Sequence, residues 1–320
     1  MNNNHFALDL DFINPSKAED EILNQLDDSY IKKSEMSFEE RAFLNALILR
    51  NKPKKLLELG VSAGGSSIVI LNAIKDIADS KLYSIDLGDY YYKNPKLKTG
   101  YLVDNYQYLK SKWELSTGGL AYSFVEKIGS GVDFCFIDTM HANPGEILDF
   151  LMVLPILKED AIVVFHDVNL HTMEKIGMIE RSITNNLLMS SIMGKEILQG
   201  NFKKSRDFFF PNIGGIKINQ GTRERLFKIF NLLTLRWHYI PSDSQETEMI
   251  SFFEKYYDSF YVNYLKDVFL YQRKTMDIRK KMDFKYKIKK TLKKVIKEKN
   301  ILKIKKLLRW GYQKTHKIAS

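Results

Sequence analysis

Short apolar runs alternate with amphipathic stretches through the middle of the chain. Runs of strand length occur at Lys55–Leu59, Leu82–Asp86, Asp133–Asp138 and Ala161–His166, and helical spacing of apolar residues covers Ser66–Ala78 and Gly145–Leu157. Because runs such as Phe134–Ile137 are apolar at every position, we expect strands that are covered on both faces. The alternation of strands and helices predicts a doubly wound α/β sheet with helices on both faces.

The segments that flank this region are mainly helical in pattern. Residues 16–50 have apolar positions at helical spacing up to the stop signal Asn51-Lys52-Pro53, and residues 170–204 also look helical. Residues 208–218 predict a late strand pair that turns at its glycines. We therefore divide the chain into N-terminal helices (1–50), a central α/β domain (51–220), a helical aromatic-rich extension (221–277) and a tail (278–320).

The positive charge of the protein is concentrated in its tail. The chain has 320 residues and a net charge of +10, but residues 278–320 alone hold 17 basic and 2 acidic residues, which leaves a net charge of −5 for residues 1–277. The high pI therefore describes a basic tail and gives no argument for a nucleic-acid-binding fold, because an acidic core is a poor phosphate platform.

The tail also has an apolar stripe. Five apolar residues fall on one side of a helix with lysines around the rest: Phe284, Ile288, Leu292, Val295 and Ile296. Basic amphipathic helices of this kind lie on anionic membrane surfaces, so we expect peripheral attachment at the inner face of the membrane. RNA binding and a merely solvated terminal helix are the alternatives.

Cysteine content and the N-terminus point to a cytoplasmic protein. Cys135 is the single cysteine, which excludes an intramolecular disulfide and a multi-cysteine zinc site, and its mid-strand position predicts a core residue. The N-terminus has no basic region followed by an apolar one, and no apolar stretch reaches the ~18 residues that a bilayer span requires.

A glycine-rich turn follows the first strand of the domain. The sequence LLELGVSAGGSS (56–67) ends an apolar strand in an acid and then leads through glycines into a helix. Gly60 and Gly64 allow a close backbone approach, and Ser62 and Ser66 lie in the turn and at the helix start, where free N–H groups could meet an adenine nucleoside. The spacing G-x-x-x-G and the missing Gly-Lys-Ser/Thr disfavour NAD and ATP.

Asp86 ends the next strand. Its carboxylate lies where it could accept two hydrogen bonds from a ribose diol, as the ribose-binding acid of dinucleotide folds does. A solvated turn residue is the alternative.

This order of features resembles class I S-adenosylmethionine-dependent methyltransferases, and most of all bacterial small-molecule and sugar O-methyltransferases. The features are E-L-G-x-x-x-G at 58–64, the acid at 86, V-D-F-C-F-I-D at 132–138 and A-I-V-V-F-H-D at 161–167. The resemblance spans roughly residues 50–218 and implies a Rossmann-like methyltransferase sheet with S-adenosylmethionine as the cofactor.

The resemblance also implies roles for particular residues. Glu58 and Gly60 match the first cofactor motif of the family, and Asp86 matches its ribose-binding acid. Thr117 and Gly118 fall near the position of the adenine. Thr139-Met140 stands where base-amino methyltransferases have Asn-Pro-Pro-aromatic, which argues against that class.

Acidic and imidazole groups follow two later strands. Asp138, His141 and the pair His166-Asp167 should meet at the carboxyl edge of the sheet, where ligands bind, with Asp138 close to both cofactor and acceptor. We predict that Asp138, His141 and His166 are catalytic, because a histidine could take the proton of an acceptor hydroxyl. The alternatives are that His141 caps the helix at Asn143-Pro144-Gly145 and that His166 is structural.

A divalent metal is a second way to activate the hydroxyl. By resemblance to metal-dependent O-methyltransferases, Asp138, His166 and Asp167 are the candidate ligands and Mg²⁺ the candidate ion, although the usual acid-amide pair is here His166-Asp167. Asp149, one helix later, could contact the His141 loop, but we expect it to face solvent.

Aromatic residues are dense outside the cofactor half, and they could stack on a sugar or form the core or a homo-oligomer interface. Residues 88–100 could form a lid. We expect an O-methyltransferase acting on a sugar or other small metabolite, with a role in surface-glycan synthesis as one setting. An RNA methyltransferase that uses the tail and a non-catalytic scaffold are the alternatives.

Overall fold

The computed structural model describes residues 11–26, 29, 35–172, 183–192, 194–199, 212–279, 281, 282 and 285. The chain divides into two units, residues 1–268 and residues 269–320. The first unit contains the sheet and all of the predicted site residues, and it also includes residues 221–268 of the predicted extension. In the second unit, residues 269–279 are helical.

One sheet of eight strands organises the described part of the first unit. The strands are β1 (Asp11–Ile13), β2 (Lys55–Leu59), β3 (Lys81–Asp86), β4 (Trp113–Thr117), β5 (Val132–Ile137), β6 (Leu157–His166), β7 (Gly194–Gln199) and β8 (Ile213–Ile218). Their order is β1-β7-β8-β6-β5-β2-β3-β4, and β8 alone runs antiparallel to its neighbours. Strands β2, β3 and β4 follow one another toward one edge of the sheet, whereas β5 and β6 follow one another toward the other edge. The strand order therefore reverses between the parallel neighbours β2 and β5, and open α/β sheets bind ligands at such a point.

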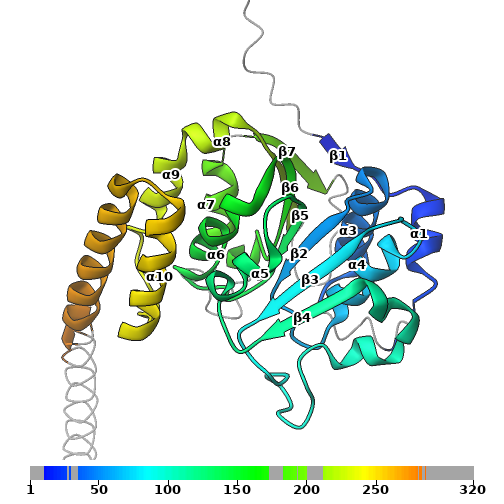
Figure 1. Ribbon diagram of the computed structural model, residues 1–320, viewed down its shortest axis with the longest axis horizontal. Coiled ribbons are helices and arrows are strands. Elements are labelled where there is room, and N and C mark those ends of the chain that lie inside the picture. Colours follow the sequence, from blue (N-terminus) through cyan, green and yellow to red (C-terminus); the bar gives the residue numbers. More distant parts are fainter. Residues whose placement is uncertain are drawn as a thin grey trace, which may run out of the picture. The chain divides into compact units, whose positions relative to one another are not determined.

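Helices cover both faces of this sheet, as the sequence predicts. The helices are α1 (Lys17–Leu23), α3 (Phe38–Asn51), α4 (Gly65–Ile74), α5 (Val125–Ile128), α6 (Gly145–Val153), α7 (Thr184–Ser191), α8 (Gln220–Glu224), α9 (Leu226–Leu232) and α10 (Asp243–Tyr256). In Figure 1, α1, α3 and α4 lie on one face of the sheet and α5, α6 and α7 on the other. The doubly wound Rossmann-like architecture is therefore confirmed.

Local sequence signals explain the boundaries of α3. Ser37 caps its start: the Ser37 Oγ accepts from the backbone N–H of Glu40, and the Glu40 carboxylate accepts from that of Ser37. The helix ends at Asn51, before Lys52 in the left-handed conformation and the predicted stop at Pro53. Phe43 and Leu47, two of the apolar residues at helical spacing in this segment, are buried and pack in the core on this face of the sheet.

The structure corrects two expectations for residues 170–218. Residues 194–199, which we expected to be helical, form β7, an edge-proximal strand too short for its periodicity to distinguish strand from helix. The expected strand pair that turns at the glycines is also wrong, because Gly214 and Gly215 lie inside β8, and β7 pairs with β8 along its length. Residues 173–182 and 200–211 lie outside the described residues.

Besides β7, two further strands have no counterpart among the predicted ones. β4 pairs in parallel with β3, and all five of its residues are half-buried. Its sequence, WELST, has no continuous apolar run that would have marked it as a strand. β1 is three residues long and pairs with β7. Among the described residues, no helix combines the length and the apolar composition that crossing a bilayer requires. The tail from residue 286 onward lies outside the described residues.

Candidate active site

The glycine turn between β2 and α4 is fixed by its neighbours on both sides. Gly60 has a φ of +86° and its N–H donates to the carbonyl of Ile85, and a Cβ atom at this position would overlap with the carbonyl oxygen of Asp138. Gly64 has a φ of +96°, and its Cβ would lie 3.0 Å from Gly100 Cα. Both glycines are therefore required by protein packing as well as by backbone conformation.

Glu58 lies beneath this turn and is completely buried. Its carboxylate accepts hydrogen bonds from the hydroxyls of Ser66 (2.7 Å), Ser67 (2.7 Å) and Ser84 (2.6 Å). Burial raises the pKa of Glu58 to about 7, although the three hydroxyl groups oppose that shift. The residue ties β2, β3 and the start of α4 together, so Glu58 and Ser66 support the turn from within.

Asp86 ends β3 directly beside the turn. Its Oδ2 accepts from the backbone N–H groups of Val61 and Ser62, both at 2.8 Å, and its Oδ1 accepts from that of Gly88 at 2.8 Å. Asp86 is thus part of the turn and not a solvated residue. A carboxylate has about four acceptor positions, so one further hydrogen bond, rather than the predicted two, fits on Asp86.

A second acid that the sequence analysis did not select lies nearby. Asp89 Oδ1 accepts a hydrogen bond of 2.6 Å from the hydroxyl of Thr117, and Gly118, at φ +80°, faces the same carboxylate. The N–H of Gly118 also donates to the carbonyl of Asp86 at 3.1 Å. Thr117 and Gly118 therefore lie next to Asp86, as their predicted place near the cofactor requires, and Asp89 adds a second exposed carboxylate.

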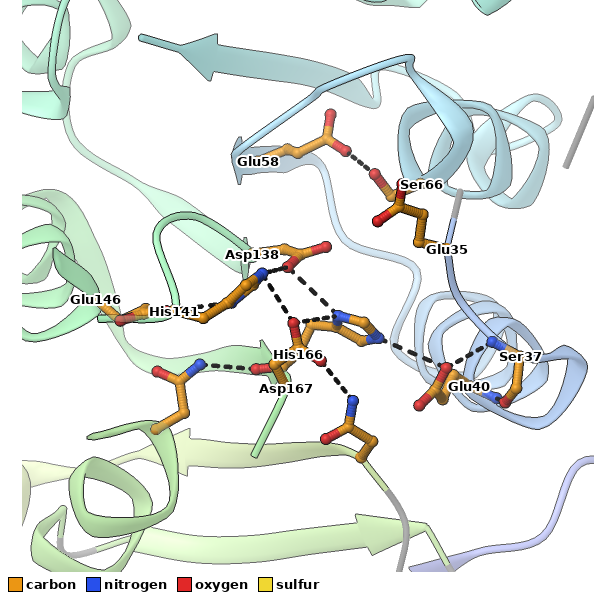
Figure 2. Close-up of polar contacts among 12 residues, drawn as sticks. Glu35, Ser37, Glu40, Glu58, Ser66, Asp138, His141, Glu146, His166 and Asp167 are labelled. Atoms are coloured by element: carbon orange, nitrogen blue, oxygen red, sulfur yellow. Dashed lines mark hydrogen bonds and ion pairs between the residues drawn. The ribbon is translucent and has the colours of Figure 1, made fainter. Parts of the chain in front are cut away.

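The predicted acid and imidazole groups converge at the carboxyl ends of β5 and β6 (Figure 2). His141 Nε2 lies 2.9 Å from Asp167 Oδ2 and 3.9 Å from Asp138 Oδ1. His166 Nδ1 lies 3.3 Å from Asp138 Oδ1 and 3.6 Å from Asp167 Oδ2. One cluster thus contains all four predicted residues, with two imidazole rings around a pair of carboxylates.

Two further carboxylates flank the cluster on opposite sides, as Figure 2 shows. Glu40, from the first turn of α3, places Oε2 3.5 Å from His166 Nε2, and Glu146, from the first turn of α6, places Oε1 3.5 Å from His141 Nδ1. The capping box Ser37-x-x-Glu40 was a detectable signal for the helix start, but nothing in the sequence links it to residue 166.

The loop after β6 is held by amides. Asn212 donates to Asp167 Oδ1 at 2.5 Å and accepts from the N–H of Asn169 at 3.0 Å, and Asn185 donates to the carbonyl of His166 at 2.7 Å. Asp167 has a φ of +56°. The amide that is missing from the pair His166-Asp167 in the sequence is therefore supplied beside Asp167 by Asn212, the residue before β8.

Carboxylates dominate the electrostatics of this cluster. Burial by itself would lower the pKa of His141, but the contacts with Asp167 and Glu146 outweigh it and raise that pKa to about 11. Burial is likewise outweighed at His166, whose pKa is raised well above its ordinary value by Asp167 and Asp138. The carboxylates therefore favour the charged form of both imidazoles, and a cation bound at the same carboxylates would favour neutral imidazoles instead.

Asp149 does not face solvent, so that expectation is wrong. The side chain is buried, Oδ2 accepts a hydrogen bond of 2.6 Å from the Thr139 hydroxyl, and burial raises the Asp149 pKa to about 7. The helical acid thereby holds the loop that carries His141. His141 does not cap α6, which was the alternative for this residue, because the helix begins after Pro144 with no side-chain cap. Cys135 is fully buried in β5, as predicted.

The residues of the cluster fit a divalent cation. Four carboxyl groups face two imidazoles, and one ligand atom from each of Asp138, His141 and Asp167 lies within 4.8 Å of the others. His141 therefore belongs to the ligand group that the structure brings together, in addition to the predicted Asp138 and Asp167. His166 Nδ1 faces the same two carboxylates from the buried side, and its role as a ligand stays a prediction.

Comparison with known proteins gives a family for this part of the chain. Residues 57–168 match a family model described as a methyltransferase domain, and this stretch runs from β2 to just beyond β6. It therefore contains the glycine turn, Asp86 and the whole strand-end cluster. No curated protein matches the chain by sequence.

Solved structures with a similar arrangement of elements are also found. One is the O-methyltransferase TomG from Streptomyces achromogenes, involved in tomaymycin synthesis, in complex with SAM; it is 14% identical, with 65% of this chain and 92% of that chain covered and a TM-score of 0.43. Another is an O-methyltransferase from Bacillus cereus in complex with SAH, at 14% identity, 64% and 92% coverage and a TM-score of 0.42.

Proposed function

We propose that the chain is a class I S-adenosylmethionine-dependent methyltransferase that transfers the methyl group to a hydroxyl oxygen of a sugar or another small metabolite. The match of residues 57–168 to a methyltransferase-domain model and the order of the strands support this proposal. S-adenosylmethionine supplies an electrophilic methyl group. The protein must therefore hold the cofactor, align the acceptor oxygen with it and promote loss of the hydroxyl proton.

The cofactor would lie over the glycine turn. The described structure offers the remaining acceptor position of Asp86 and the exposed carboxylate of Asp89 for the ribose hydroxyls, with Thr117 and Gly118 beside them. Glu58 fixes the position of the turn through Ser66 and Ser67 without reaching the surface. Asp86 would therefore act in two ways: it accepts hydrogen bonds from the N–H groups of the turn, and it would accept one from the cofactor.

The observation that carries the proposal is the direct junction between this turn and the strand-end cluster. The backbone N–H of Asp138 donates to the carbonyl of Leu59 at 2.9 Å, and the carbonyl of Asp138 lies against Gly60. The first residue of the cluster is thus in contact with the first residue of the turn. An acceptor bound at the cluster would lie next to a cofactor bound at the turn.

Hydroxyl activation falls to the exposed side of the cluster. The side chains of His141 and Asp138 are 33% and 20% exposed, whereas those of His166 and Glu40 are 5% and 6% exposed. We therefore assign acceptor binding and activation to Asp138 and His141, and a supporting position to His166. A divalent cation held by Asp138, His141 and Asp167 would lower the pKa of an acceptor hydroxyl.

The sugar or small-molecule class is supported by aromatic groups near the cluster. Tyr92 is 66% exposed, its hydroxyl lies 3.0 Å from Glu35 Oε1, and its pKa is raised by burial, by Tyr91 and by the charge of Asp138. Tyr90, in the same segment, is also exposed. Exposed tyrosines beside carboxylates provide the stacking and hydrogen bonding that a polyhydroxylated ring needs.

An acceptor screen tests the proposal. The full chain would be incubated with S-adenosylmethionine and separate pools of nucleotide sugars, free sugars, phenols and RNA, and the release of S-adenosylhomocysteine would be measured. Release with a hydroxylated small-molecule pool, lost in Asp138→Asn, supports the proposal. Release only with RNA, or tight cofactor binding with no release from any pool, would replace it with the RNA or scaffold alternative.

A further inference from the structure

Glu146 is the most enclosed ionisable group beside the cluster. It lies in the first turn of α6 and its side chain is 1% exposed. Neither of its carboxylate oxygens accepts a hydrogen bond from the described residues. Burying a charged carboxylate without hydrogen bonds costs roughly several kcal/mol of desolvation free energy, so Glu146 requires a compensating partner.

That partner is the imidazole of His141. Nδ1 lies 3.5 Å from Glu146 Oε1, and the opposite ring nitrogen, Nε2, faces Asp167 and Asp138. Figure 2 shows the ring between Glu146 on one side and the two aspartates on the other. Histidines that bind a metal through one nitrogen characteristically donate their other N–H to a carboxylate, which fixes the tautomer and the direction of the ring.

The three outward ligand atoms have the spacing that a shared ion requires. Ligand atoms about 2.1 Å from one ion lie about 3 Å apart when adjacent and about 4 Å apart when opposite. Nε2 of His141 lies 2.9 Å from Asp167 Oδ2 and 3.9 Å from Asp138 Oδ1, within that range. These three side chains are 33%, 11% and 20% exposed, so an ion can reach them from solvent.

We propose that Glu146 is a positioning residue that directs His141 Nε2 toward Asp138 and Asp167, and that the resulting site of one nitrogen and two oxygens binds a divalent first-row transition-metal ion in preference to Mg²⁺. Imidazole nitrogen favours such ions over Mg²⁺, while carboxylate oxygens accept either, so the histidine decides the preference. The inference deepens the proposed function and rests on it for its purpose, but ion binding can be measured without any acceptor.

The test measures ion affinity of the full chain after treatment with a chelator. Mn²⁺ binding is followed by the loss of the free-ion electron paramagnetic resonance signal, and Mg²⁺ binding by competition. We expect Mn²⁺ to bind at least about tenfold more tightly than Mg²⁺, and Glu146→Gln to weaken Mn²⁺ binding by about 10–100-fold, the usual effect of losing such a carboxylate. S-adenosylmethionine affinity should not change.

Asp149→Asn is the matched control, because Asp149 is a buried acid of the same helix that contacts Thr139 instead of His141. The amide oxygen of an asparagine can still accept the Thr139 hydrogen bond that holds the His141 loop. This control should leave Mn²⁺ affinity unchanged. His141→Asn provides a second variant in case Glu146→Gln fails to fold, and it should abolish the preference for Mn²⁺. Equal Mn²⁺ and Mg²⁺ affinity in the wild type, or equal Mn²⁺ affinity in wild type and Glu146→Gln, would overturn the inference. Neither result would decide whether the chain transfers a methyl group to a hydroxyl, because the acceptor screen tests that proposal separately.

Discussion

Gly60 lies against the backbone carbonyl of Asp138, so closely that a Cβ atom at residue 60 would overlap with the carbonyl oxygen. This contact joins the end of β2 to the end of β5, and it brings the proposed cofactor turn and the proposed acceptor cluster together. The two parts of the site are therefore joined through backbone atoms. A substitution that changes only the Asp138 side chain would leave this contact in place.

The contact predicts an unusual sensitivity of residue 60 to a single methyl group. Gly60→Ala should abolish measurable cofactor binding and destabilise the protein, because both the overlap and the left-handed backbone oppose it. Gly131→Ala is a matched control, since Gly131 has a φ of +88° but a Cβ atom there would lie 4.0 Å from Lys158 Cε, at ordinary contact distance. The control should lose roughly 1–2 kcal/mol of unfolding free energy from backbone strain alone. Gly60→Ala should lose a further 1–3 kcal/mol or so from overpacking, as measured by urea unfolding. Equal losses in the two variants would contradict the contact.

Asp86 should contribute strongly to cofactor affinity. Asp86→Ala removes both a ligand-facing carboxylate and the acceptor of the Val61 and Ser62 N–H groups, so we expect S-adenosylmethionine binding to weaken by about 1.5–3 kcal/mol. Calorimetric titration measures this loss directly. Asp89→Ala, at the neighbouring exposed acid, should have a smaller effect because Asp89 does not hold the turn. Unchanged affinity in Asp86→Ala would refute the cofactor assignment.

Glu58 should make stability depend on pH. Its pKa is raised by burial from 4.5 to about 7, so between these values the folded protein binds more protons than the unfolded chain. The free energy of unfolding must then fall as pH rises from about 4.5 to 7, by on the order of 3 kcal/mol from this group. Glu58→Gln cannot ionise and should lack that part of the decrease, which urea unfolding at several pH values would detect. Identical pH dependence in the two proteins would exclude a raised pKa at Glu58.

The tail prediction comes from sequence alone, because the tail from residue 286 onward lies outside the described residues. Fifteen net positive charges and an apolar stripe in residues 278–320 should add their contributions on an anionic surface. We expect the full chain to co-sediment with anionic vesicles, less so at higher salt, and a chain lacking residues 278–320 to remain in solution with its cofactor affinity intact. Equal sedimentation of both chains would remove the membrane interpretation, and salt-dependent RNA binding by the full chain alone would favour the RNA alternative.

The sequence predicted the parallel centre of the sheet because β5 and β6 are continuous apolar runs with polar residues at their ends. Asp138, His141, His166 and Asp167 could be placed at one edge for the same reason, since parallel strands end on the same side. By contrast, β4 and β7 have mixed composition, and neither contains a continuous apolar run that would mark it as a strand.

The supporting residues could not be predicted in the same way. Glu40, Glu146 and Asn212 reach the cluster from three separate elements, and their contacts arise only from tertiary packing. An acid within a helix is usually exposed to solvent, and the sequence does not show that Asp149 is buried against the Thr139 hydroxyl. Sequence patterns thus predicted which four groups meet at the edge of the sheet, but not the residues that hold them there.

The most direct test of the central claim is to follow the methyl group itself. Full-length protein would be supplied with S-adenosylmethionine carrying a ¹³C-labelled methyl group and with a pool of hydroxylated small molecules, and the product would be examined by carbon NMR. We expect an O-methyl resonance with the wild type and none with Asp138→Asn, although that variant should still bind the cofactor. An N-methyl or C-methyl product, or an O-methyl product formed equally well by Asp138→Asn, would contradict it.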